Sequence, residues 1–325
     1  MVDAAADRDV SEPQSLLRRI VDFPLVALVF AVLLYAFATA IAIAAGSQLP
    51  AMAPDLATMI KGALSIALVF GVYKLAIRNL GSPEREHDDL PLRGFFKDSG
   101  LGLLAGFAIF SLVVGIAALA DVYNVKGYGG TGALLSSLVA LAIVPAFMEE
   151  MLFRGILFRW IEEFGGSWAA LFVTSALFGA AHIMNDNATW FSSFTIAMEA
   201  GLLLGGAYML TRSLWMPIGL HAAWNFTQGF LFDVPVSGFD QNGLVEAQLS
   251  GPELLSGGRF GLEASVIALA VATAAGIWLI QLAVKRGELV QPYWVRRRLA
   301  GGGSEEAVGI DVDGDADPAA PLDRA

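Results

Sequence analysis

Long apolar runs alternate with short polar segments along most of the chain. A transmembrane helix needs about 20 predominantly apolar residues to cross the ~30 Å hydrocarbon core of a bilayer. The pattern predicts eight such helices, over residues 24–45, 57–77, 100–120, 133–163, 167–184, 194–210, 215–232 and 262–284. The predicted fold class is therefore all-α, a polytopic membrane protein.

The segments between and beyond these runs predict three regions. Residues 1–22 form a polar N-terminal segment, 23–286 an eight-helix membrane domain, and 287–325 a soluble, largely disordered acidic tail. A glycine-rich loop at 124–132 and a polar loop at 233–259 connect helices, and glycines 165 and 166 are expected to end the fourth helix. Pro145 is expected to free a backbone carbonyl within that helix.

Composition excludes several classes of protein. The chain is 56% hydrophobic and 16% charged, which is too apolar for a soluble globular protein. The net charge of −11 resides mainly in the two termini, where residues 1–14 carry −3 and residues 304–325 carry −6. No nucleic-acid partner is expected, and the absence of cysteine excludes disulfides, thiolate metal sites and a cysteine nucleophile.

The basic residues predict the orientation of the chain. With eight spans and a cytoplasmic N-terminus, 17 Lys and Arg residues fall on the inner side, and Lys126 and Arg259 fall on the outer side. Positive residues gather in cytoplasmic loops. Both termini are therefore predicted to be cytoplasmic.

Two adjacent acids and an arginine interrupt the apolar fourth helix. Glu150 and Arg154 are four residues apart, with the acid on the N-terminal side, which is the favourable order for an ion pair. Glu149 lies about 100° around the helix from Glu150. We therefore expect Arg154 to neutralise Glu150 and leave Glu149 free for proton chemistry, with an interfacial charge cluster as the alternative.

Two further helices carry histidines within apolar surroundings. The fifth contains Phe178 and His182, and the seventh contains His221 and Asn225 on one face. Charged and ionisable residues inside a membrane are costly, so they are functional candidates by default. Glu199 in the sixth helix is another intramembrane acid, which either lines a cavity or lies near the outer interface.

These residues resemble those of a known family. Glu-Glu-x-x-x-Arg, Phe-x-x-x-His and His-x-x-x-Asn, in this order, resemble the CAAX-processing and bacteriocin-processing (CPBP, or Abi) intramembrane endopeptidases. The likeness covers about residues 133–230. It implies that Glu149, His182, His221 and Asn225 are catalytic and that Glu150, Arg154 and Phe178 support them.

In the favoured mechanism, Glu149 is the general base that activates water with His182, and His221 and Asn225 stabilise the oxyanion. This mechanism requires no cofactor. In a metallopeptidase variant, Glu149, His182 and His221 would bind a catalytic zinc ion. The expected partners are a membrane-associated peptide or protein substrate and the lipid bilayer, in the bacterial inner (cytoplasmic) membrane.

Two other functions use the same residues. The polar side chains could form a proton or ion path in a transporter, or the chain could be a non-catalytic immunity or scaffold protein. The peptidase interpretation also requires His182 and His221 to lie at one depth. A count along straight, equally immersed helices places them roughly 13 Å apart.

Overall fold

The structure is a computed structural model that describes residues 20–81 and 88–305. His87, which the sequence suggests is a solvated loop residue, lies outside the described residues, as do most of the N-terminal segment and the end of the acidic tail.

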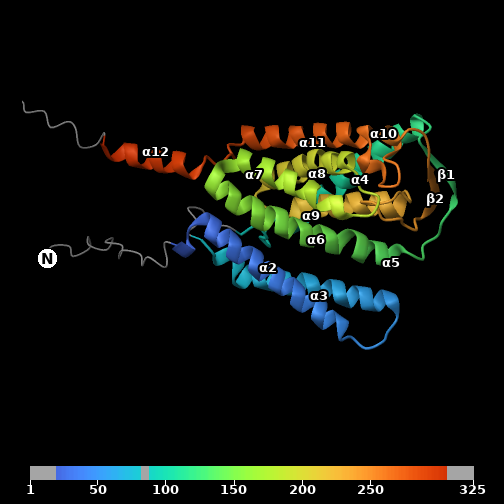
Figure 1. Ribbon diagram of the computed structural model, residues 1–325, viewed down its shortest axis with the longest axis horizontal. Helices are drawn as coiled ribbons and strands as arrows, with labels where there is room; N and C mark the ends of the chain where they lie inside the picture. The colour runs from blue at the N-terminus through green and yellow to red at the C-terminus, as the bar shows by residue number, and fades with distance from the viewer. Residues whose placement is uncertain (1–19, 82–87, 306–325) are drawn as a thin grey trace, which may run out of the picture.

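Helices run along the long axis of the molecule (Figure 1). The longer ones are α2 (Pro24–Ser47), α3 (Pro54–Leu75), α4 (Phe95–Leu119), α7 (Arg159–Ala181), α8 (Trp190–Thr211), α9 (Trp215–Phe226), α11 (Val266–Lys285) and α12 (Tyr293–Glu305). Shorter elements are α5 (Leu134–Ser136), α6 (Val144–Glu150) and α10 (Glu253–Ser256), the π-helical segments η2 (Ser137–Ile143), η3 (Met151–Phe158) and η5 (Thr227–Leu231), and the 3₁₀ turns η1 (Ile77–Asn79), η4 (His182–Met184) and η6 (Leu262–Ala264). Of the tail predicted to be largely disordered, residues 293–305 are helical.

Six helices within the described residues are long and apolar enough to cross a membrane. They are α2, α3 with η1, α4, the continuous stretch Leu134–Met184, α8 and α11. The predicted seventh span corresponds largely to α9, which has 12 residues. The structure therefore supports an integral membrane protein, while the count of eight and the cytoplasmic termini stay predictions.

The 51-residue stretch Leu134–Met184 contains a sharp backbone turn. Gly166 has φ 82° and ψ 169°, which is not helical, so two helical segments meet there. A Cβ at this position would lie 2.9 Å from the carbonyl oxygen of Val290. The predicted break between the fourth and fifth helices is confirmed, because a residue with positive φ and no side chain is needed at this turn.

Two strands correct the all-α prediction. β1 (Tyr123–Tyr128) pairs in antiparallel fashion with β2 (Val245–Leu249), at the end of the molecule opposite α12 (Figure 1). The sequence predicts loops in both segments. Both strands are short and lie in segments of loop-like composition. Each pairs with a strand about 120 residues away, so no local sequence pattern predicts the pairing.

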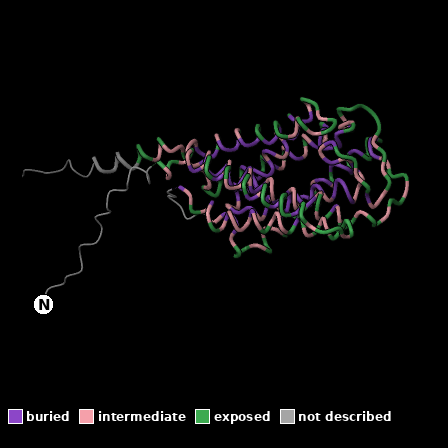
Figure 2. The backbone as a smooth tube through the Cα atoms, turned by 60° about the horizontal axis from the view of Figure 1, so that its bottom comes forward, coloured by how far each residue is buried: buried purple, intermediate pink, exposed green. Residues whose placement is uncertain are grey.

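The helices α2 and α3 expose much of their apolar surface, whereas α8 is largely buried (Figure 2). On α2, for example, Phe37 is 64% exposed. Exposed apolar surface of this extent indicates contact with lipid. The bundle therefore encloses α8, which carries Glu199, and α9, which carries His221 and Asn225.

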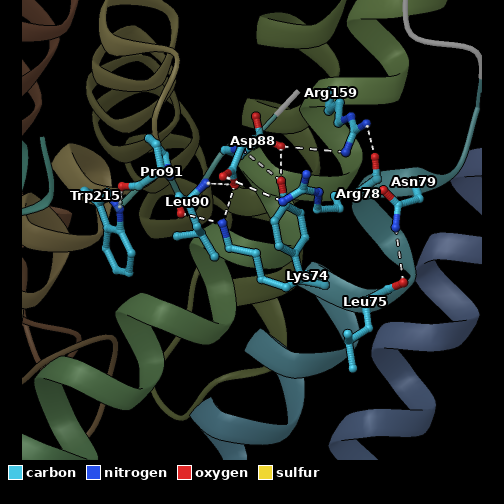
Figure 3. A network of polar contacts seen from close by, with 11 residues as sticks. Lys74, Leu75, Arg78, Asn79, Asp88, Leu90, Pro91, Arg159 and Trp215 are labelled. Atoms are coloured by element: carbon cyan, nitrogen blue, oxygen red, sulfur yellow. Dashed lines mark hydrogen bonds and ion pairs between the residues drawn. The ribbon is translucent and has the colours of Figure 1, made fainter. Parts of the chain in front are cut away.

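A buried polar network anchors the segment between α3 and α4 (Figure 3). Asp89 is 2% exposed and accepts hydrogen bonds from the hydroxyls of Tyr73 (2.6 Å) and Tyr208 (2.7 Å). Two residues further on, the carbonyl of Pro91 accepts a hydrogen bond from the indole of Trp215 at 2.8 Å. A segment that the sequence indicates only as a charged loop thus joins α3, α8 and α9.

Glycines allow α4 and α9 to pack closely. A Cβ on Gly106 would lie 2.2 Å from the carbonyl oxygen of Leu220, and a Cβ on Gly102 would lie 2.2 Å from that of Met216. Small residues permit such close helix approach in membranes. The contact places α9, and with it His221, against α4.

We expect Gly106→Ala to destabilise the protein by about 1–3 kcal/mol, because the new methyl group meets backbone that cannot rotate away. Thermal unfolding of the detergent-purified protein measures the loss. Gly115→Ala on the same helix is the matched control, since its Cβ would meet no atom within 4 Å. Equal unfolding temperatures for the two variants would contradict the proposed packing constraint.

Candidate active site

The Glu149-Glu150 pair ends α6 and lies between two π-helical segments, η2 and η3. Such segments occur often at functional sites. Pro145 has no N–H with which to bond the carbonyl of Leu141, four residues earlier. Asn225 donates to this carbonyl instead, with its Nδ2 3.1 Å from the oxygen. This hydrogen bond therefore connects the helix that carries the Glu149-Glu150 pair to α9.

Glu150 and Arg154 form a completely buried ion pair. Both side chains are 0% exposed, and Arg154 Nη1 lies 2.9 Å from Glu150 Oε1. Arg154 Nη2 also donates to the carbonyl of Ala200 on α8 at 3.1 Å, and its guanidinium carbon lies 4.7 Å from the centre of the Phe178 ring on α7. The predicted pair is present, and it joins η3 to α7 and α8.

His221 contacts both acids. Its Nδ1 lies 3.0 Å from Glu150 Oε1, the same oxygen that accepts from Arg154, and its Nε2 lies 4.0 Å from Glu149 Oε2. Because the carboxylate of Glu150 accepts hydrogen bonds, Nδ1 is the donor. The spacing of Glu150 and Arg154 could not show this third partner, which comes from another helix.

Glu149 is the more accessible acid. Its side chain is 35% exposed, and its Oε2 has no hydrogen-bond partner among the described residues. The structure thus separates the two adjacent carboxyl groups: Glu150 is completely buried against Arg154 and His221, and the Glu149 side chain is partly exposed.

His182 begins η4, directly after α7. Its Nδ1 lies 2.7 Å from the carbonyl oxygen of Phe178. A carbonyl only accepts hydrogen bonds, so Nδ1 carries the hydrogen and Nε2 of the neutral ring keeps its lone pair. His182 is therefore oriented as a hydrogen-bond acceptor through Nε2.

The two histidines face the same phenyl ring. The Phe178 ring centre lies 4.8 Å from that of His182 and 6.2 Å from that of His221. The offset of roughly 13 Å is therefore wrong, because it assumed straight helices of equal immersion.

An open cleft of about 540 Å³ brings the motif residues together. Glu149, His182 and Asn225 line it, between α5–α6 on one side and residues 236–242 on the other. A smaller cavity of about 30 Å³ adjoins this cleft, since His182, Asn225 and Ser237 line both, and His221 lines the smaller one. The four predicted catalytic side chains therefore surround two adjoining spaces.

Residues 236–242 form a wall of the cleft that the sequence does not predict. Asn185 Nδ2 donates to the carbonyl of Ser237 at 3.1 Å, and Asn187 Nδ2 donates to that of Gly238 at 3.0 Å. The backbone N–H of Ser237 donates to Glu263. The sequence indicated only a polar loop here, because these contacts join residues far apart in the chain.

The proposed zinc ligands do not form a ligand cluster in this structure. Among the described residues, no group of three or more His, Cys, Asp and Glu side chains is arranged to hold a metal ion.

The model of a protein family described as type II CAAX prenyl endopeptidase Rce1-like matches residues 131–227. This range contains every motif position from Glu149 to Asn225. The resemblance to the CAAX-processing endopeptidase family is confirmed. The match covers the helices that build the cleft and supports the general interpretation of a membrane protease.

A curated relative agrees with the family match. The Bacillus subtilis (strain 168) protein named "Putative membrane peptidase YdiL" is 29% identical over 184 residues, which cover 52% of this chain and 70% of that protein. No solved structure matches this chain.

We expect Glu150→Ala to destabilise the protein by about 3–5 kcal/mol, because it leaves Arg154 buried without its carboxylate partner. Thermal unfolding in detergent measures the change. Glu149→Gln is the matched control, with an expected loss below about 1 kcal/mol because its side chain is partly exposed and makes no direct hydrogen bond through Oε2. A Glu150→Ala variant as stable as the control would refute the structural role of the pair.

Proposed function

We propose that this chain is an intramembrane endopeptidase that hydrolyses a peptide bond of a membrane-associated peptide or protein. The observation that carries the proposal is the convergence of Glu149, His182 and Asn225 on one open cleft, with His221 in the adjoining cavity. Intramembrane acids and histidines that share an accessible space are suited to proton chemistry. The family match covers all four residues.

Glu149 and His182 are placed to activate water. Glu149, whose side chain is 35% exposed, and His182, whose Nε2 keeps its lone pair, both line the cleft, and in the proposal both accept hydrogen bonds from a water molecule there. In the proposed first step, Glu149 takes a proton from this water, and the hydroxide oxygen bonds to the scissile carbonyl carbon. The carbonyl oxygen then carries the negative charge.

Asn225 and His221 are placed to stabilise that charge. Asn225 Nδ2 uses one hydrogen on Leu141, so its second hydrogen remains for the oxyanion. His221 donates through Nδ1 to Glu150, and when the ring is protonated its Nε2 donates as well, with Glu150 as the counter-charge. Fixed donors aimed at a developing oxyanion lower the barrier without reorganisation.

The intermediate then collapses. The bond between carbon and nitrogen breaks, and the proton held by Glu149 passes to the departing amine, which leaves a carboxyl product and restores the Glu149 carboxylate. Glu150 and Arg154 take no part in these transfers. They hold His221 and the motif helix in position, and such preorganisation accounts for much of enzymatic catalysis.

The proposal is metal-free, with no cofactor required, and the substrate reaches the cleft within or next to the bilayer. We also propose the bacterial inner membrane as the location, with eight spans and both termini in the cytoplasm. The seventh of these spans would be α9 with η5, tightly packed against α4.

We expect Glu149→Gln to lower the cleavage rate by at least about 100-fold, because general-base catalysis contributes 10²–10⁴. The variant should fold normally and retain bound substrate. Substrate-trapping proteomics on membranes, comparing wild type with Glu149→Gln, measures both effects. The control is Glu246→Gln, an exposed acid on β2.

If the wild-type protein and the Glu149→Gln variant gave identical membrane peptidomes and captured the same proteins, the peptidase function would be refuted and a scaffold function favoured. Metal analysis of the active wild-type protein tests the metal-free mechanism. A stoichiometric bound metal whose removal abolishes cleavage would contradict it.

We expect Asn225→Ala to lower kcat by about 10²–10³, because it removes one oxyanion donor, with little change in KM. It also removes the bond to Leu141, at a stability cost of about 1 kcal/mol. Pro145→Ala in the same variant offers Leu141 a backbone donor, so it should restore stability but not kcat. Recovery of both would show that Asn225 is structural only.

A further inference from the structure

The small cavity holds two carboxyl groups that the proposed hydrolysis does not use. Glu199 from α8 and Glu263 from η6 line it, next to His221 and Trp224 of α9. Glu149 lines the neighbouring cleft instead. The cavity therefore has an acidic wall of its own. Glu199 thus lines a cavity, which is one of the positions that its sequence context allows.

Neither acid has a cationic partner among the described residues. Glu199 is 1% exposed and Glu263 is 3% exposed, and no ion pair joins either one to a described Lys or Arg side chain. Glu199 Oε2 has no hydrogen-bond partner in the same part of the chain. Buried carboxyl groups require a paired cation or a bound proton.

The hydrogen bonds around this wall leave its charge uncompensated. Glu263 accepts from the backbone N–H of Ser237, which is a neutral donor. Arg154 donates to the carbonyl of Ala200, the residue after Glu199, but its charge is paired with Glu150. Among the described residues, Glu199 and Glu263 thus have no Lys or Arg counter-ion, and His221 is the ionisable base that lines the same cavity.

The dimensions of the cavity limit what could enter. Its free volume is about 30 Å³, and a water-sized group takes roughly 10–15 Å³ on this measure. An ammonium group is compact, whereas a guanidinium is a wide planar fork. The remaining wall includes Leu203, Leu204 and Leu220, which suit the methylene stem of a lysine.

The cavity adjoins the cleft where hydrolysis would take place. Ser237, His182 and Asn225 line both spaces, so a side chain passing them from the cleft reaches Glu199 and Glu263. A peptide whose scissile carbonyl lies near Asn225 would have a neighbouring side chain at this entrance.

We propose that Glu199 and Glu263 form a specificity pocket that binds the ammonium group of a substrate lysine beside the scissile bond. This inference rests on the proposed peptidase function and names a substrate class for it. The ligand is a primary alkylammonium, and lysine is preferred over arginine because the cavity is small.

The first arm of the test measures cleavage. Wild-type protein in liposomes is given membrane-anchored fluorogenic peptides that differ only in carrying lysine, arginine, norleucine or glutamate next to the cleaved bond. We expect kcat/KM for lysine to exceed that for norleucine about tenfold or more, because a charge-assisted hydrogen bond to a buried carboxylate is strong. Glu199→Gln and Glu263→Gln should each lower this ratio toward one.

The matched control is Glu246→Gln, which should keep the lysine-to-norleucine ratio of the wild type because this exposed acid lies outside both spaces. A ratio is compared within each variant, so a general loss of activity does not affect it. Glutamine can still accept from the Ser237 N–H, which preserves the local fold.

The second arm does not depend on cleavage. Pentylamine should raise the unfolding temperature of the wild-type protein more than 1-pentanol does, and both Gln variants should lose the difference. Cleavage without a lysine preference, or a preference that survives both substitutions, would overturn the pocket while leaving the peptidase intact.

Failure to cleave any peptide, with the amine effect present, would overturn the peptidase and the lysine assignment together. No amine effect together with no lysine preference would overturn the pocket alone.

Discussion

The buried carboxylate of Glu150 organises the centre of this protein. It accepts from Arg154 on its own helix and from His221 on α9, and Arg154 in turn contacts α8 and the Phe178 ring of α7. A charge removed from water is costly unless every partner is in place. One residue therefore requires four helical elements to adopt a single arrangement, and that arrangement forms the cleft.

Glu149 and Glu150 are adjacent in sequence but have different environments because of helix geometry. Successive residues point about 100° apart, so Glu150 enters the core when Glu149 faces the cleft. Pro145 contributes by freeing the carbonyl of Leu141, which Asn225 then binds. A local irregularity in one helix thereby sets the distance to another, as is common where π-helical turns occur.

The acidic wall formed by Glu199 and Glu263 extends this arrangement. Glu199 and Glu263 lie beyond His221, in a cavity that touches the cleft, and they have no cation among the described residues. The surroundings of His221 thus hold four buried or half-buried acids, Glu149, Glu150, Glu199 and Glu263, and among the described residues only Glu150 is paired with an arginine. Such an excess of acid next to a reaction site suits a cationic substrate group.

The sequence alone determined the membrane class, the break at Gly166 and the Glu150–Arg154 pair, and it identified Glu149, His182 and Asn225 but not residues 236–242 of the cleft lining. Each depends on composition or on spacing within one helix, where geometry is fixed by about 3.6 residues per turn. The tertiary structure alone decided that His221 binds Glu150, that His182 and His221 lie near one phenyl ring, that β1 pairs with β2, and that Glu263 faces the site. These contacts join distant segments, and helix stagger and loop closure set them, so no local pattern encodes them.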